Sequence, residues 1–178
     1  MQTLALDGIN VVQGEWWRLW SAHLTHYSMS HAAVNALVLF FAGGIVEIRM
    51  GTRWLATRLL VVAPLLSIAL LLWSPDLVEY RGLSAVCVCL TVVAMISVAR
   101  DSHQAFAVIA LLAIALLLKL IGDAQGASMD LANLPQGVIL DWRSHVLGAL
   151  AGVAIAVQSG LSPNRQIAAA SPRRQPSR

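Results

Sequence analysis

Charged side chains are scarce in this sequence. They make up 12% of its 178 residues, whereas 58% of the residues are apolar. A soluble domain of this length normally carries about 25% charged and about 45–50% apolar residues. The composition therefore excludes an ordinary soluble domain. It predicts an all-α, polytopic membrane protein, because a helix satisfies its own backbone polar groups in lipid.

Several motifs that would indicate other chemistry are missing. His23-Leu24-Thr25-His26 lacks the glutamate of a His-Glu-x-x-His zinc site, and no glycine-rich phosphate loop is present. No aspartate lies within a predicted membrane span, which excludes an aspartyl pair. Repeated halves and broken helices, the signs of a transporter, are missing as well. We therefore expect no metal and no cofactor.

The net charge of +3 does not indicate a nucleic-acid partner. Four of the twelve basic residues follow Ser162. We interpret residues 159–178 as a disordered basic tail at the membrane surface, which is the usual explanation of such a run. The two cysteines, Cys87 and Cys89, are two positions apart in one apolar helix, so they point in different directions and cannot pair.

Five apolar segments are predicted to cross the membrane within a core formed by residues 30–158. At about 1.5 Å per residue they are about 22–30 Å long, which suits short or tilted spans. Residues 1–29 contain tryptophans among scattered charges, and we predict an outer interfacial loop with a short amphipathic helix there. The predicted spans are residues 30–46, 54–73, 82–99, 104–121 and 143–157.

The distribution of basic residues predicts the orientation. One set of connections, comprising residues 47–53 with Arg58, the turn at 100–103 and the tail, holds eight basic residues against two acidic ones. The opposite set holds two, or three with Arg143. Because basic residues are enriched in cytoplasmic loops, the tail is predicted to be cytoplasmic and the N-terminal segment to lie outside. This suits a multi-pass protein of a bacterial inner membrane.

The same alternation brings three reactive side chains to one depth. The first, third and fifth spans run from outside to inside, so their N-terminal ends lie near the outer surface. His31, Ser84 and His145 each lie within about one turn of such an end. Polar residues in spans are costly and usually face the bundle interior, where they often serve function.

His31 and Ser84 also have structural explanations, which remain open at this point. His31 and Asn35 are four apart on one helix face, and both could hold the bundle together through interhelical hydrogen bonds. Ser84 could donate to the carbonyl four residues earlier, as serines in membrane helices commonly do. Gly82 favours the functional interpretation, because it lets the backbone enter the helix from a tight loop.

His145 begins a stripe that it shares with Gly148 and Gly152. The Gly-x-x-x-Gly spacing lets two helix backbones approach closely. Such an approach would bring the imidazole within about 3 Å of a hydroxyl, where it can act as a base. The alternative is a packing stripe with an incidental histidine.

Five motifs follow one another in order between residues 14 and 152. They are Gly14-Glu15-Trp16-Trp17-Arg18, His26-x4-His31-x3-Asn35, Gly43-Gly44-x2-Glu47, Gly82-Leu83-Ser84-Ala85 and Ser144-His145-x2-Gly148. Together they resemble the rhomboid intramembrane serine proteases. Tyr80-Arg81-Gly82-Leu83-Ser84 most resembles the rhombosortase branch, which is associated with surface proteins that end in a Gly-Gly motif, an apolar span and a basic tail.

The resemblance implies a rhomboid-like transmembrane helix bundle that cleaves transmembrane proteins near the outer face of the lipid bilayer. It implies that Ser84 is the nucleophile and His145 the general base. It also implies that the side chains of His31 and Asn35, with the Ser84 amide, form the oxyanion site. The family core has six spans, so a first span is expected to be missing from this sequence before Gly14.

Two positions depart from the family pattern. Ala85 stands where glycine is usual, and Val88 stands where an aromatic residue or histidine would stack on His145. These departures favour the alternative of a non-catalytic rhomboid-like protein that binds membrane helices without cutting them. A structural membrane subunit is a further, remoter alternative.

Overall fold

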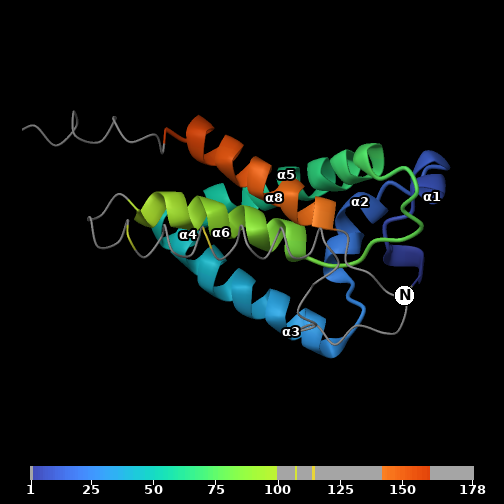
Figure 1. Cartoon of the computed structure of the whole chain (residues 1–178), viewed down its shortest axis with the longest axis horizontal. Coiled ribbons are helices and arrows are strands. Elements are labelled where there is room, and N and C mark those ends of the chain that lie inside the picture. Colours follow the sequence, from blue (N-terminus) through green and yellow to red (C-terminus); the bar gives the residue numbers. More distant parts are fainter. Residues whose placement is uncertain (1, 100–106, 108–113, 115–141, 161–178) are drawn as a thin grey trace, which may run out of the picture.

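The computed structural model describes residues 2–99, 107, 114 and 142–160. Within these residues every named element is a helix, and the all-α prediction is confirmed for them. The long helices lie side by side, and the short N-terminal helices gather at one end of the bundle (Figure 1). The helices are η1 (Gln2–Leu4), α1 (Gly8–Val12), α2 (Arg18–Ser21), η2 (Ala22–Leu24), α3 (Met29–Val38), η3 (Leu39–Gly43), α4 (Gly44–Met50), α5 (Thr52–Trp73), α6 (Ser84–Val98) and α8 (Trp142–Gln158).

Helices α3, η3 and α4 form one continuous apolar helix. The Ser28 hydroxyl caps its start by accepting a hydrogen bond from the His31 amide at 3.0 Å. Gly51 ends it with a φ of 90°, a conformation that glycine adopts without steric cost. The combined helix Met29–Met50 is long and apolar enough to cross a membrane.

Helix α5 is the second helix of sufficient length and apolar character. Pro64 lies inside it and has no N–H to donate to the carbonyl of Leu60, four residues earlier. The indole N–H of Trp20 donates to that carbonyl at 2.9 Å. The proline therefore leaves free one of the α5 acceptors to which the N-terminal segment binds.

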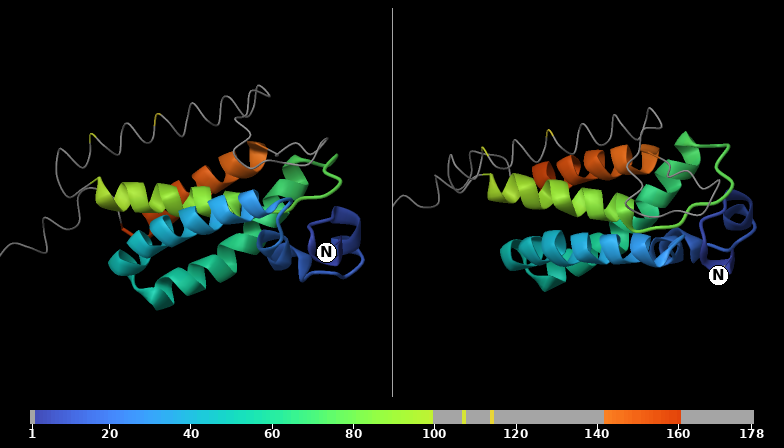
Figure 2. Two further views of the ribbon diagram at one scale, coloured as in Figure 1. Left: turned by 90° about the horizontal axis from the view of Figure 1, so that it is seen from below. Right: turned by 60° about the horizontal axis from the view of Figure 1, so that its bottom comes forward.

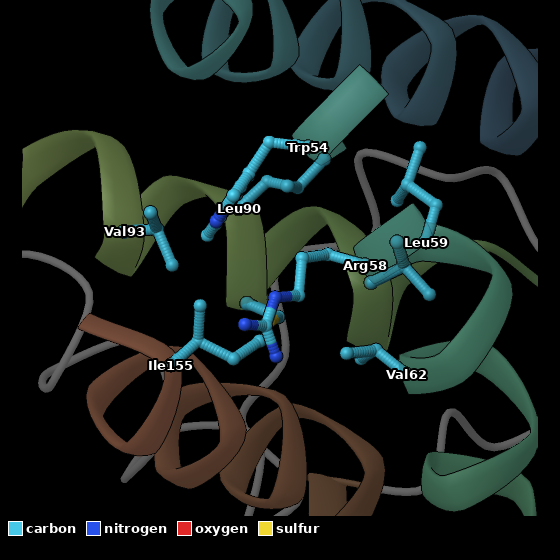
Figure 3. Close-up of a pocket in the computed structure, with 9 residues that line it drawn as sticks. Trp54, Arg58, Leu59, Val62, Leu90, Val93 and Ile155 are labelled. Atoms are coloured by element: carbon cyan, nitrogen blue, oxygen red, sulfur yellow. The ribbon is translucent and has the colours of Figure 1, made fainter. Parts of the chain in front are cut away.

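Helix α6 occupies the centre of the bundle and packs mainly against α8. Most of its residues are buried, among them Val86, Leu90 and Val93. Along the α6 segment from Val86 to Val93, side chains of α5, α6 and α8 converge (Figure 3). The guanidinium of Arg58 lies 5.4 Å from the centre of the Trp54 ring there, which is a favourable arrangement for a cation near an aromatic face.

The described helices differ from the predicted segments mainly at their ends. The segment predicted at 30–46 continues to Met50, and that predicted at 143–157 is extended by one residue at each end. The predicted segment 104–121 lies outside the described residues except for 107 and 114. Ser84–Val98 is a shorter apolar helix, so the number of membrane spans stays a prediction.

Two expectations about local structure are corrected. Residues 1–29 contain not one short helix but several, because Asp7 caps α1 and Gly14 turns the chain with a φ of 104° before α2. The third apolar helix begins at Ser84 and not at Gly82, whose φ of 130° is incompatible with a right-handed helix. Ser84 is therefore the first helical residue of α6.

Candidate active site

The three reactive side chains predicted to share one depth lie at the same end of the bundle. His31 is in the first turn of α3, Ser84 opens α6, and His145 is in the first turn of α8. All three helices start at the end where the N-terminal segment lies (Figure 2). His31 and His145 are each 4% exposed, whereas Ser84 is half-buried.

The backbone of Gly82 lies against the imidazole of His31. A Cβ atom at Gly82 would be 2.8 Å from Cε1 and 3.2 Å from Nε2 of that ring. The Gly82 amide donates to the Ala22 carbonyl at 3.0 Å. Glycine is thus required twice, by its positive φ and by the contact with the ring. This contact brings the loop before Ser84 to the first turn of α3.

His23 holds the same loop from the other side. Its Nδ1 lies 3.3 Å from the Gly82 carbonyl oxygen, and its Nε2 lies 2.9 Å from the Ala63 carbonyl oxygen of α5. Nε2 is also 3.0 Å from the Ser67 hydroxyl, which donates to the Leu19 carbonyl. Burial lowers the pKa of His23.

The sequence gives no sign of this role for His23. Its ring contacts groups 40, 44 and 59 residues away in the chain. Two of these partners are backbone carbonyls, which every residue possesses. Motif spacing therefore cannot distinguish it from a solvated loop histidine.

Aromatic rings fix the His31 imidazole in place. Tyr27 stacks on it with ring centres 6.2 Å apart and planes 5° apart, and His26 meets it edge-on at 5.1 Å. The Arg81 guanidinium lies 5.8 Å from the Tyr27 ring centre and pairs with the Glu79 carboxylate. The Tyr27 hydroxyl donates to the Glu79 carbonyl at 3.1 Å.

Tyr27 remains protonated at neutral pH. Burial, with the charge of Glu79, raises the pKa of its phenol to about 12. Its hydroxyl can therefore donate a hydrogen bond throughout the physiological range. The stack of Tyr27 on His31 keeps a neutral phenol beside the site.

His31 and Asn35 carry polar atoms with no hydrogen-bond partner among the described residues. These atoms are both ring nitrogens of His31 and the side-chain amide nitrogen of Asn35. Each residue is only 4% exposed. A buried polar group without a partner costs about 1–3 kcal/mol. Donors held at such a cost are suited to an acceptor that arrives with a ligand, such as a developing oxyanion.

The backbone carbonyl of Asn35 ties α3 to the serine helix. It accepts a hydrogen bond from the Cys87 thiol at 3.3 Å. Cys87 is three residues after Ser84 and is buried, so it lies on the next turn of α6. This bond fixes the Asn35 backbone against the helix that carries the serine.

The glycine stripe of α8 lies against the first turns of α6. A Cβ atom at Gly148 would be 2.2 Å from the Ala85 carbonyl oxygen, and one at Gly152 would be 2.6 Å from that of Cys89. The contact pairs advance by four residues on both helices, so α6 and α8 run parallel. His145 lies one turn before Gly148, toward the end of α6 at which Ser84 begins the helix. His145 is also close enough to His31 for their charges to interact.

Ala85 does not keep α8 away. It is 2% exposed, and its backbone forms the contact with Gly148. Val88, the other departure noted in the sequence, is half-buried. Within the described residues, no group of three or more histidine, cysteine or acidic side chains is arranged to hold a metal ion.

A protein-family model described as "Rhomboid domain" matches residues 13–160. The matched region includes Ser84, His145, His31 and Asn35. No curated protein matches the chain significantly.

Proposed function

Because the chain belongs to the rhomboid family, whose members are typically intramembrane serine proteases, we propose that it is an intramembrane serine endopeptidase with a Ser84–His145 dyad. Two contacts support this proposal. Gly148, one turn after His145, lies against the Ala85 backbone at the start of α6, and Gly82, in the loop before Ser84, lies against the His31 ring. Membership of this family also implies that the chain is an integral membrane protein that forms a helix bundle.

The proposed reaction proceeds through an acyl-enzyme. The Ser84 Oγ attacks the carbonyl carbon of the scissile peptide while its proton passes to His145. The tetrahedral intermediate then collapses, the C–N bond breaks, and the leaving amine takes the proton from His145. A water molecule, deprotonated by His145, hydrolyses the ester and restores the Ser84 hydroxyl. Two steps of this kind replace one more difficult step.

The unpartnered donors carry the proposal. A tetrahedral intermediate places negative charge on the former carbonyl oxygen, and His31 and Asn35 hold buried donors with no partner among the described residues. The Ser84 amide, at the N-terminus of α6, supplies a further donor. Removal of one such donor typically lowers kcat about 10²–10³-fold.

The proposed substrates are transmembrane proteins cleaved near their outer ends. The segment Tyr80-Arg81-Gly82-Leu83-Ser84 supports the narrower proposal of C-terminal Gly-Gly sorting segments. The basic residues at the other end of the bundle support an orientation with the tail in the cytoplasm. In this proposal residues 1–29 form the outer segment, 30–158 the membrane core and 159–178 the cytoplasmic tail.

Co-expression with an epitope-tagged substrate that ends in such a sorting segment tests the proposal. Ser84→Ala and His145→Ala are expected to abolish cleavage. Ser159→Ala, at the opposite end of α8, is the matched control and is expected to cleave normally. A fluorophosphonate probe should label the protein only when both Ser84 and His145 are intact. Cleavage that persists in Ser84→Ala would show that the dyad is wrong.

The departures at Ala85 and Val88 support a second candidate, a non-catalytic protein that binds membrane helices. The same experiment separates the two. A non-catalytic binder is crosslinked to the tagged substrate equally well with and without the Ser84→Ala substitution, and the fluorophosphonate labels neither form.

A further inference from the structure

The phenol of Tyr80 lies beside the first turn of α6, where no motif assigns it a role. We propose that Tyr80 is a positioning residue that orients the Ser84 hydroxyl toward His145. This inference rests on the proposed function, in which Ser84 is the nucleophile. It adds a third side chain to a dyad that has no acidic member.

The backbone of Tyr80 is fixed by the N-terminal segment. It forms an antiparallel bridge with Leu6, in which each residue donates to the other's carbonyl at 3.0 Å. The side chain is 4% exposed and belongs to a buried cluster with Leu6, Leu19, Ala22 and Leu70. The His23 ring meets it edge-on at 6.2 Å. The bridge and the surrounding side chains therefore restrict the phenol to one orientation.

The hydroxyl of Tyr80 faces three polar groups at the active site. They are the hydroxyls of Ser84 and Ser144 and the backbone of Ala85. None of them forms a hydrogen bond of normal geometry with it among the described residues, so the buried hydroxyl is left unsatisfied. Buried tyrosine hydroxyls usually have a partner. Rotation of the Ser84 side chain about its Cα–Cβ bond moves its Oγ and can supply one here.

The chemistry of these groups sets the direction of the bonds. Burial raises the pKa of Tyr80, so the phenol stays protonated at neutral pH and acts as a donor, not as a base. In the proposed arrangement its O–H donates to the Ser84 Oγ, while its oxygen accepts from the Ser144 hydroxyl. An Oγ that accepts from Tyr80 must direct its own hydrogen elsewhere. The base available for that hydrogen is His145 on the neighbouring helix.

A merely structural tyrosine would act through its ring alone. Tyr80→Phe keeps the ring and removes only the hydroxyl, so it separates the two roles. We expect kcat to fall about tenfold, the loss that one hydrogen bond implies, with KM unchanged. The rate of fluorophosphonate labelling at Ser84 should fall by the same factor. The midpoint of the pH–rate profile should not move, because His145 remains the base.

Ser144→Ala removes the hydroxyl that donates to the phenol. It should slow labelling in the same direction, by about two- to threefold. In the double variant Tyr80→Phe/Ser144→Ala, labelling should be no slower than in Tyr80→Phe, because Ser144 acts through Tyr80. If Tyr80→Phe is too unstable to assay, the Ser144→Ala variant tests the same series of hydrogen bonds. A wild-type labelling rate in Ser144→Ala would then contradict the role of Tyr80.

The outcomes separate this inference from the proposed function. If Ser84→Ala still cleaves, the dyad itself is wrong. If Ser84 is required while Tyr80→Phe has wild-type kcat and labelling rate, the dyad stands and the role of Tyr80 is refuted. A Tyr80→Phe variant in which kcat falls only together with the melting temperature also refutes it, since that pattern indicates a structural residue.

Discussion

Gly148 of α8 lies directly against the backbone of Ala85 on α6, so closely that a Cβ atom at Gly148 would be 2.2 Å from the Ala85 carbonyl oxygen. Ala85 follows Ser84, and His145 lies one turn before Gly148. The contact between two helix backbones therefore determines how near the imidazole comes to the serine. The proposed chemistry depends on this distance between the His145 imidazole and the Ser84 hydroxyl.

Gly148→Ala is expected to separate α6 from α8. Backbone atoms of Ala85 cannot move aside as a flexible side chain can, so we expect a loss of about 1–3 kcal/mol in the free energy of unfolding. The rate of fluorophosphonate labelling at Ser84 should fall at least tenfold, because His145 moves away from Ser84 together with α8. Thermal unfolding in detergent and labelling kinetics measure the two effects.

Gly44→Ala is the control for Gly148→Ala. Gly44 is helical with a φ of −60°, and nothing lies within 4 Å of a Cβ atom there. This substitution should be neutral or stabilising by about 0.5–1 kcal/mol. A Gly148→Ala variant as stable as Gly44→Ala would contradict the close contact.

Gly82→Ala should abolish labelling at Ser84. The added methyl would meet the His31 ring at 2.8 Å, in addition to the strain of a φ of 130°. Gly51→Ala separates the two causes, since Gly51 has a φ of 90° with open space around it. We expect Gly51→Ala to lose about 1–2 kcal/mol of stability while it keeps normal labelling kinetics. Equal labelling by the two variants would show that the His31 contact does not matter.

The stability of the protein should depend on the protonation of His23. Burial lowers the pKa of His23 and of His26, below the ordinary value of about 6.5. Below about pH 6.5 the unfolded chain binds protons that the folded protein does not yet accept. The free energy of unfolding should therefore decrease as the pH falls from about 6.5 toward the folded pKa values.

His23→Gln tests the contribution of His23. It should lower stability at pH 8, because the ring contacts with Ala63 and Gly82 are lost. It should also make the decline of the melting temperature between pH 7 and pH 5 shallower than in the wild type. His26→Gln, which keeps His23, serves for comparison. An unchanged pH dependence in His23→Gln would exclude His23 as a cause.

Arg18→Lys should loosen the N-terminal segment. The Arg18 side chain is 4% exposed, its Nη1 donates to the Ala5 carbonyl at 2.8 Å, and its Nε donates to the Glu15 carboxylate at 2.5 Å. A lysine cannot reproduce this forked arrangement. We expect a loss of about 1–3 kcal/mol and faster proteolysis before α2. Arg53→Lys, at an exposed position of α5, should change neither.

The positions of the helices were predictable from the sequence because the membrane leaves few alternatives. Apolar runs in lipid must be helical, and alternate crossings put the N-terminal ends of odd-numbered spans on one side. His31, Ser84 and His145 were assigned to one depth by this reasoning alone. The glycine spacing of Gly148 and Gly152 likewise predicted a close approach of α8 to another helix.

Only the tertiary structure determined how these groups are held. Ser84 begins its helix because Gly82 adopts a φ of 130° under the His31 ring, and His23 grips the loop through carbonyls up to 59 residues away. The backbone of Tyr80 is held by its bridge to Leu6. These contacts join backbone groups or lone side chains across long stretches of chain. Hydrophobic periodicity and motif spacing describe local faces of helices, so the sequence by itself predicted that the reactive residues share one end of the bundle, and only the fold determined the contacts that hold them there.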